Sequence, residues 1–293
     1  MLKILYAAMV FLGSSFSLFA EVEYEIHAGY STICTIRAFE GDLEPGGRVL
    51  ELRTYHAAPG KLDALLNRFR DHTCKLFVKH GMINIGYWVP AENPDNLLIY
   101  LMAYRGKNAR DASWKAFLAD PEWKAVQAAS EGDGKLVEKV DQLFMTPTDF
   151  SEGFAKIVPD QPKDAPELHD YFPAPAGNEH LFEMRTYTAT PGHLPNLHAR
   201  FRDHTQALFK KHGMTNLAYF QFTPDQPGAD DKLLYFLAHK DMDAATKSWA
   251  DFRADPDWVA AKKASEEQAG GSLTTDGGVV SLFLKATDFS PVK

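Results

Sequence analysis

Hydrophobic and polar residues follow strand and helix periods over the first half of the chain. Residues 49–55 alternate as a half-buried strand does, whereas residues 83–89 and 97–104 are nearly continuous apolar runs typical of buried strands. Between the first two strands, residues 61–80 carry apolar side chains at helical spacing, and Gly81 predicts a left-handed helix end. The pattern therefore predicts the order strand, helix, strand, strand.

Two further elements complete this unit. Residues 109–119 place apolar side chains on one face and predict a helix. Asp120 and Pro121 then predict a second helix, because aspartate caps helix N-termini and proline fits the first turn. Residues 136–145 predict a last strand. The order β-α-β-β-α-β is that of the ferredoxin-like fold, with one antiparallel sheet of four strands.

The whole unit occurs twice in the sequence. Residues 51–87 and 183–219 are identical at 23 of 37 positions, and a match of this length does not arise from composition alone. The match continues into residues 113–123 and 248–258, and both copies close on the tetrapeptide Thr-Asp-Phe-Ser. We therefore expect two domains of the same fold.

We expect the chain to be divided into five parts. The domains occupy residues 48–151 and 179–290, an irregular leader lies at 21–47, and a proline-rich linker lies at 152–178. Residues 1–20 have a basic start, an apolar run and a final small residue, the layout of a cleaved signal peptide. That run is shorter than the roughly 20 residues of a membrane span. We therefore expect a periplasmic or secreted protein, with an uncleaved membrane anchor as the alternative.

The strand at residues 97–104 is apolar on both of its faces, so both faces of its sheet need cover. The helices of one unit cover one face only, and the sheet of the other unit can cover the second face. We therefore predict an α+β fold in which two tandem ferredoxin-like domains form an intramolecular dimeric α/β-barrel.

Charged residues occupy one face of the first strand in each copy. Glu51 and Arg53 recur as Glu183 and Arg185. We expect this face to meet the partner sheet, where buried charges need partners, so we predict that the two pairs meet across the barrel and fix its register. Catalytic carboxylates are the alternative interpretation.

The net charge and the lack of several known motifs argue against particular classes of function. The chain has 31 basic and 39 acidic residues, a net charge of -8 and no basic block, so nucleic acid is not an expected partner. It contains no phosphate-binding glycine loop, Cys-x-x-Cys, His-Glu-x-x-His or nucleophile elbow, so we predict no metal and no cofactor. Whether Cys34 and Cys74 are bonded to one another stays open.

Four short motifs recur in the same order in both copies. They are Glu-Leu/Met-Arg-Thr-Tyr, the Pro-Gly turn, the Lys-His-Gly-Met helix end and the Asp-Pro-Glu/Asp-Trp cap. Together they resemble the NIPSNAP family over both repeats. The resemblance implies a dimeric α/β-barrel, a superfamily that also includes cofactor-independent monooxygenases, isomerases and haem-degrading proteins. Because the export-type N-terminus departs from the mitochondrial members, their roles are not carried over.

Histidine and arginine recur on the first helix of each copy. At 100° per residue, Arg70 and His72 flank the apolar stripe, and the second copy repeats them as Arg202 and His204. We expect each pair to line a ligand pocket between the helix and the sheet. One tyrosine and one tryptophan of each copy complete the predicted pockets: Tyr87, Trp114, Tyr219 and Trp249.

Two functions fit this pattern. The first is an exported binding or interaction protein that holds a small hydrophobic or aromatic ligand. The alternative is a cofactor-independent monooxygenase or isomerase, with His72 or His204 as the base and Arg70 or Arg202 holding an anion. An open cavity lined by these residues would favour the enzyme, and bonds only to their neighbours would favour the binding protein. Further association of chains through the outer helices stays open.

Overall fold

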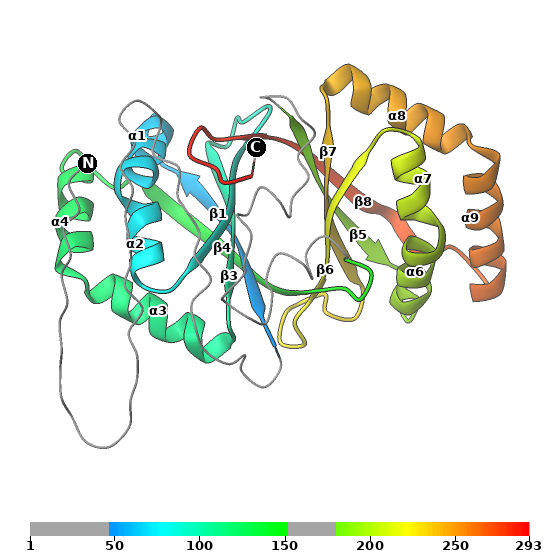
Figure 1. Ribbon diagram of the computed structural model, residues 1–293, viewed down its shortest axis with the longest axis horizontal. Helices are drawn as coiled ribbons and strands as arrows, with labels where there is room; N and C mark the ends of the chain where they lie inside the picture. Colours follow the sequence, from blue (N-terminus) through cyan, green and yellow to red (C-terminus); the bar gives the residue numbers. More distant parts are fainter. Residues whose placement is uncertain (1–46, 152–179, 293) are drawn as a thin grey trace, which may run out of the picture. The chain divides into compact units, whose positions relative to one another are not determined.

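A closed barrel of eight antiparallel strands is the central feature of the structure (Figure 1). The computed structural model describes residues 47–151 and 180–292. The predicted signal peptide and linker lie outside the described residues, as does the predicted leader apart from Gly47. Cys34 is outside them too, whereas Cys74 is buried in a helix.

The first half of the barrel contains the elements that the sequence pattern predicts, with bounds that differ by at most two residues. Its strands are β1 (Val49–Ala57), β2 (Ile83–Pro90), β3 (Leu97–Tyr104) and β4 (Val137–Pro147). Its helices are α1 (Leu62–Arg68), the π-helical turn η1 (Phe69–Thr73), α2 (Cys74–Lys79), α3 (Lys107–Ala119) and α4 (Pro121–Ser130).

The second half repeats this order. Its strands are β5 (Leu181–Ala189), β6 (Thr215–Phe222), β7 (Lys232–His239) and β8 (Thr274–Ala286). Its helices are α6 (Leu194–Arg200), the π-helical turn η4 (Phe201–Thr205), α7 (Gln206–Lys211), α8 (Met242–Ala254) and α9 (Pro256–Ala269). In the part of the chain that the structure describes, no helix has the length and hydropathy needed to cross a membrane.

The strands follow the order β1-β3-β2-β8-β5-β7-β6-β4 around the barrel. Strands of the same half pair along most of their length, whereas β2 with β8 and β4 with β6 pair at three positions each. The helices of each half lie on the outside of their own four strands (Figure 1). The fold is therefore α+β, with two tandem ferredoxin-like domains forming an intramolecular dimeric α/β-barrel, as predicted.

Strand β3 shows why both faces of each sheet are covered. Ile99 and Leu101 point into the barrel, where they share one core with Phe182, Phe236 and other residues of the second half. The intervening side chains of β3 pack beneath the helices of the first half in a separate core. The prediction that the second domain covers the remaining apolar face is confirmed.

The first helix of each half is interrupted, although the sequence pattern predicts one regular helix. A π-helical turn of sequence Phe-Arg-Asp-His-Thr separates two short α-helices in both halves. The Thr73 hydroxyl donates to the carbonyl oxygen of Arg68 at 3.1 Å, and Thr205 donates to Arg200 at 3.0 Å. A π-helical turn contains more residues than an α-helical turn, so a projection at 100° per residue is out of phase beyond it.

Asp120 begins α4 and ties it to the first helix. One oxygen of its carboxylate accepts a hydrogen bond from the backbone N–H of Glu122 at 2.8 Å, as the sequence predicts for a helix cap. The other oxygen lies 2.7 Å from His80 Nε2 and 2.8 Å from Lys79 Nζ at the end of α2. This contact holds α4 against the helix that precedes it.

After its last strand, each half extends a short arm onto the other half. The arms are the repeated Thr-Asp-Phe-Ser segments, residues 148–151 and 287–290. Phe289, from the second half, packs in the core beneath the first-half helices, and Phe150 packs beneath the second-half helices. Each half therefore receives part of its core from the other.

Hydrogen bonds fasten the two arms in the same way. The Ser290 hydroxyl accepts from the backbone N–H of Tyr87 at 2.9 Å, and the Ser151 hydroxyl accepts from that of Tyr219 at 2.9 Å. Both bonds are buried, where an unsatisfied N–H costs most. The exchange of arms is thus specific and symmetric.

Candidate functional site

The arginines predicted to hold a ligand anion join the two halves of the barrel. Arg70 donates to both oxygens of Asp288 at 2.6 and 2.8 Å. Arg202 does the same to Asp149 at 2.9 and 2.7 Å. Both aspartates belong to the exchanged arms, so each arginine binds the arm that its half receives.

The histidines predicted as candidate bases do not lie in a pocket between helix and sheet. His72 and His204 are exposed on the π-helical turns η1 and η4. Because the π turn shifts the phase of the helix, these residues face solvent instead of flanking the apolar stripe. The structure therefore does not bring His72 together with Tyr87 and Trp114.

The Glu–Arg pairs of the first strands lie beneath the helices of their own half. Arg53 Nη1 donates to Glu51 Oε1 at 2.5 Å, and Arg185 Nη1 donates to Glu183 Oε1 at 2.5 Å. The predicted pairing across the barrel is therefore wrong. The hydrophobic residues between these charges occupy the barrel interior, and a dry core disfavours charged side chains.

Glu51 is the centre of a buried hydrogen-bond cluster. Besides Arg53, it accepts from Arg110 Nε and Nη2 at 3.0 and 2.7 Å, from Tyr104 at 3.1 Å and from Trp114 Nε1 at 3.2 Å. Burial opposes the charge of Glu51, but the hydrogen bonds and positive charges of Arg110 and Arg53 outweigh it and lower the pKa of the carboxyl group. Two guanidinium groups therefore share one ionised, buried carboxylate.

An open cavity of about 590 Å³ lies over this cluster, between the helices and the sheet of the first half. Six aromatic side chains line it: Tyr55, Phe69, Phe77, Trp114, Phe117 and Trp123. Five basic side chains line it as well: Arg53, Arg68, Arg110, Lys135 and Lys139. Only two acidic side chains oppose them there, Glu131 and Glu138. Aromatic walls with an excess of positive charge suit an anionic, aromatic group.

Arg53 is fixed at the base of this cavity. Its guanidinium carbon lies 4.2 Å from the centroid of the Trp114 ring, a cation–π distance, and the Tyr55 hydroxyl lies 3.5 Å from Nη2. The residue is 6% exposed, and its Nε is buried without a hydrogen-bond partner. The base of the cavity therefore contains a positioned cation with one unused donor.

The corresponding cluster of the second half has different members. Glu183 accepts from Trp249 Nε1 at 2.7 Å and from the Ser281 hydroxyl at 2.6 Å, and it lies 2.8 Å from His239 Nε2. His239 stands where the first repeat has a tyrosine, and Ala245 stands where it has Arg110. This cluster therefore has one arginine and one histidine in place of two arginines.

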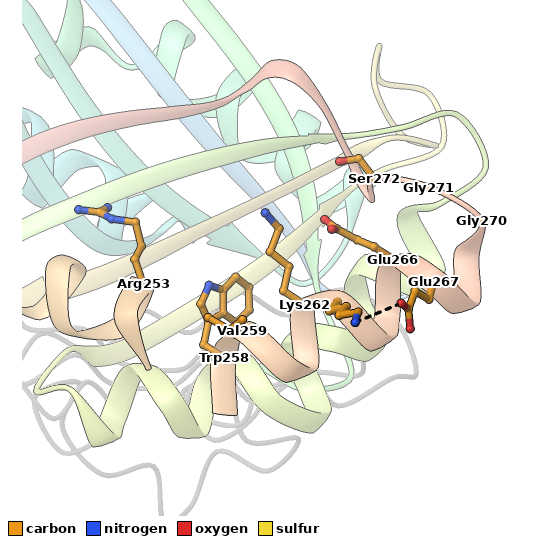
Figure 2. A pocket seen from close by; sticks show the side chains of 10 residues that line it. Arg253, Trp258, Val259, Lys262, Glu266, Glu267, Gly270, Gly271 and Ser272 are labelled. Carbon is orange, nitrogen blue, oxygen red and sulfur yellow. Dashed lines mark ion pairs between the residues drawn. The ribbon is translucent and has the colours of Figure 1, made fainter. Parts of the chain in front are cut away.

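The second half has a hollow of about 760 Å³ along α9 (Figure 2). Figure 2 shows Trp258, Lys262 and Glu266 following one another along this helix. Neither Arg185 nor Trp249 is among the described residues that line the hollow. The first-half cavity reaches its buried cluster, and the second-half hollow does not.

Comparison with known proteins identifies the family. The sequence model of the NIPSNAP family matches residues 50–152 and 182–291. The chain belongs to the NIPSNAP family. The two matched stretches correspond to the two repeats, so this is a tandem NIPSNAP protein, as its motifs predict.

Several solved structures are similar to this NIPSNAP protein at low sequence identity. An uncharacterized NIPSNAP domain protein from Burkholderia xenovorans is 24% identical, covering 35% of this chain and 96% of its own, with a TM-score of 0.31. A putative monooxygenase from Fusobacterium nucleatum is 11% identical, covering 82% and 92%, with a TM-score of 0.48. An anthrone oxidase-like protein is 10% identical, covering 86% and 94%, with a TM-score of 0.47. A search among curated proteins found no match.

Of the four aromatic residues that the sequence predicts for the two ligand pockets, one lines the first-half cavity. Trp114 lines the cavity, whereas Tyr87 and Tyr219 are fully buried in the cores beneath the helices, and Trp249 is buried against Glu183. The repeat pattern does not indicate Arg110 as a site residue, because the second repeat has no arginine at that position.

The second-half cluster predicts a loss of stability in acid. Burial opposes the charge of Glu183, but the hydrogen bond with His239 and the charge of Arg185 outweigh it and lower its pKa from 4.5 to about 2. Such a group stabilises the fold above pH 4.5, and this contribution is lost as the pH falls towards 2. Between pH 7 and pH 3 we expect the wild type to lose about 2 kcal/mol more unfolding free energy than Glu183→Gln. Urea unfolding at both pH values measures this difference, and equal losses would contradict the prediction.

Proposed function

We propose that this NIPSNAP protein binds a small anionic aromatic ligand in the cavity of its first half. The observation that carries the proposal is the sharing of Glu51 by Arg53 and Arg110 at the base of an aromatic cavity. One buried carboxylate balances one guanidinium, and a ligand carboxylate is a suitable partner for the second. Asp111 also meets Arg110, at 3.0 Å, but it lies at the surface, where water screens its charge.

The dimensions and walls of the cavity suit such a ligand. A volume of about 590 Å³ falls in the range of small-molecule pockets, roughly 300–1,000 Å³. The Trp114 ring already stacks on the Arg53 guanidinium, and other aromatic rings surround it. A flat ring can pack against these walls while its carboxylate accepts hydrogen bonds at the base.

The same geometry supports binding over catalysis. The residues proposed as the base of a cofactor-independent monooxygenase or isomerase, His72 and His204, are exposed on π-helical turns. Arg70 and Arg202 bind aspartates of the exchanged arms. No histidine is among the described residues that line the first-half cavity, so the base that such an enzyme needs is not supplied by imidazole there.

Titration with benzoate tests the proposal directly. We expect saturable binding to the purified full chain, measured by calorimetry, and weaker binding of benzamide, which has the same ring but no charge. Arg110→Gln should weaken benzoate binding by about tenfold or more, because it removes a charged donor from the cavity. Arg253→Gln is the matched control, since Arg253 lines the hollow of the second half.

Two results would overturn the proposal. One is benzoate binding that Arg110→Gln leaves unchanged, which would place the ligand elsewhere. The other is an absence of benzoate binding together with a native mass spectrum of the purified protein that shows no retained aromatic acid. Retention of such an acid by the wild type, and its loss from Arg110→Gln, would support the proposal independently.

We also propose that the protein is exported. Support comes from the sequence of residues 1–20, which has the basic start, apolar run and small final residue of a signal peptide. The intact mass of protein recovered from an expressing bacterium tests this. Export predicts a periplasmic or secreted product that lacks residues 1–20, and a full-length product at the membrane would contradict it.

A further inference from the structure

A groove of about 280 Å³ separates α6 and η4 from α9 on the second half, apart from the hollow shown in Figure 2. Four of its side chains can donate hydrogen bonds besides an arginine at its wall, Arg200. These four are Asn196, His204, Ser265 and Gln268, and one carboxylate, that of Asp203, lies among them. The other four lining residues are small and apolar, so the polar side chains of the groove are mostly ones that can donate to an anion.

Arg200 is a buried cation with two guanidinium nitrogens that make no hydrogen bond. Its side chain is 4% exposed, and neither Nε nor Nη1 has a hydrogen-bond partner. Glu266 Oε1 forms an ion pair with Nη1 at 3.6 Å, a separation longer than a hydrogen bond. Burial lowers the pKa of Arg200, and the nearby charge of Glu266 does not offset this. A buried guanidinium without acceptors is costly, so this site favours an anion that supplies them.

In the first half, residues of α4 and its C-terminal end supply acceptors to one nitrogen of the equivalent arginine. Arg68 Nη1 donates to the Ser130 hydroxyl at 3.2 Å and to Glu131 Oε1 at 2.9 Å. The second repeat keeps a serine and a glutamate at these positions, but they make no such hydrogen bonds to Arg200. Nε lacks a hydrogen-bond partner in both arginines, whereas Nη1 lacks one only in Arg200.

Substitutions around the groove also distinguish the second repeat. Pro195 and Gln268 stand where the first repeat has Asp63 and Asp133, so two negative charges that would repel an anion are gone. Two alanines replace larger residues and widen the groove: Ala199 for Asn67, and Ala261 for Val126. The groove around Arg200 therefore has fewer acidic side chains than the equivalent surface of the first half.

We propose that this groove is a binding site for a small oxyanion, a phosphate or carboxylate group held by Arg200 with His204 beside it. A guanidinium presents paired donors in one plane, which match two oxygens of such a group. The site is separate from the first-half cavity and uses none of the residues that line it. It also gives His204 a role that the exposed π-helical turn does not otherwise suggest.

Trp258 offers a specific signal for this site, because its ring lies 5.3 Å from the Arg200 guanidinium carbon. We expect inorganic phosphate or acetate to shift the Trp258 indole N–H resonance of the full chain in a saturable way. The resonance is assigned with Trp258→Phe. Arg200→Gln should weaken this binding by about tenfold or more, and the equivalent Arg68→Gln should leave it unchanged.

A second variant keeps the test valid if Arg200→Gln does not fold. Ala261→Leu fills the groove without altering the arginine and should also abolish the saturable shift. The stronger of the phosphate and acetate responses identifies the preferred oxyanion. Chloride at matched ionic strength giving the same shift, saturation that survives both variants, or a shift confined to Trp114 and Trp123 would each overturn the proposal.

Discussion

Replacement of Glu51 by alanine is expected to lower the unfolding free energy by about 3–5 kcal/mol, because it leaves the buried Arg53 and the partly buried Arg110 without their shared carboxylate. Arg53 is 6% exposed, and the ring of Trp114 in α3 lies against its guanidinium, so water can replace little of the lost interaction. Arginine also cannot escape the cost by losing its proton. Urea unfolding of the full chain at neutral pH measures the change.

The equivalent change in the second half provides the control. Glu183→Ala should cost less than Glu51→Ala, because only one guanidinium, that of Arg185, then loses its carboxylate partner. Equal losses would show that the number of arginines around the carboxylate is unimportant. A loss below about 1 kcal/mol for Glu51→Ala, the range of exposed ion pairs, would contradict the burial argument itself.

Truncation of Phe289 to alanine is expected to lower the unfolding free energy by about 3–5 kcal/mol, the usual cost of removing a fully buried phenylalanine ring. We also expect the loss of local stability to occur in the first half, although Phe289 belongs to the second repeat. Phe289 belongs to the second repeat but packs in the core of the first, against Tyr87 at a ring separation of 5.4 Å. Faster hydrogen exchange should therefore appear in β2 and the first-half helices.

Two control variants test whether the effect of Phe289→Ala is specific. Phe150→Ala should produce the mirror result, with faster exchange in β6 and the second-half helices, because Phe150 packs against Tyr219. Val280→Ala, at a position of β8 that is 62% exposed, should leave the exchange of both halves unchanged. Faster exchange confined to the second half in Phe289→Ala would contradict the exchange of arms as a determinant of stability.

The barrel could be predicted from the sequence because two features that determine it, strands apolar on both faces and a repeat of the whole unit, are visible in the sequence. The two apolar faces of β3 require two covers, and the repeat supplies the second one within the same chain. It was harder to predict which face of the first strand points into the barrel. Alternation shows that Glu51 and Leu50 point to opposite faces, but it does not show which face is inward. Three other residues, Arg110, Trp114 and Tyr104, decide this by enclosing Glu51 under the helices.

The candidate site could be predicted only in part for two physical reasons. The π-helical turn is not visible in apolar spacing, so a projection at 100° per residue gives the wrong side-chain directions for Arg70 and His72. The second reason is the divergence of the repeats. Comparison of the two copies indicates residues that occur in both. Arg110 occurs in the first copy only, because Ala245 stands at the equivalent position of the second.

Covalent fusion of the two repeats has a consequence for how such a protein can change over time. In a homodimer every substitution appears twice, once in each subunit, so its two sites stay identical. Here a mutation alters one half and leaves its counterpart untouched. The cavity beside α3 and the groove beside α9 show such independent change, because Ala245 stands in place of Arg110 and Ala261 in place of Val126.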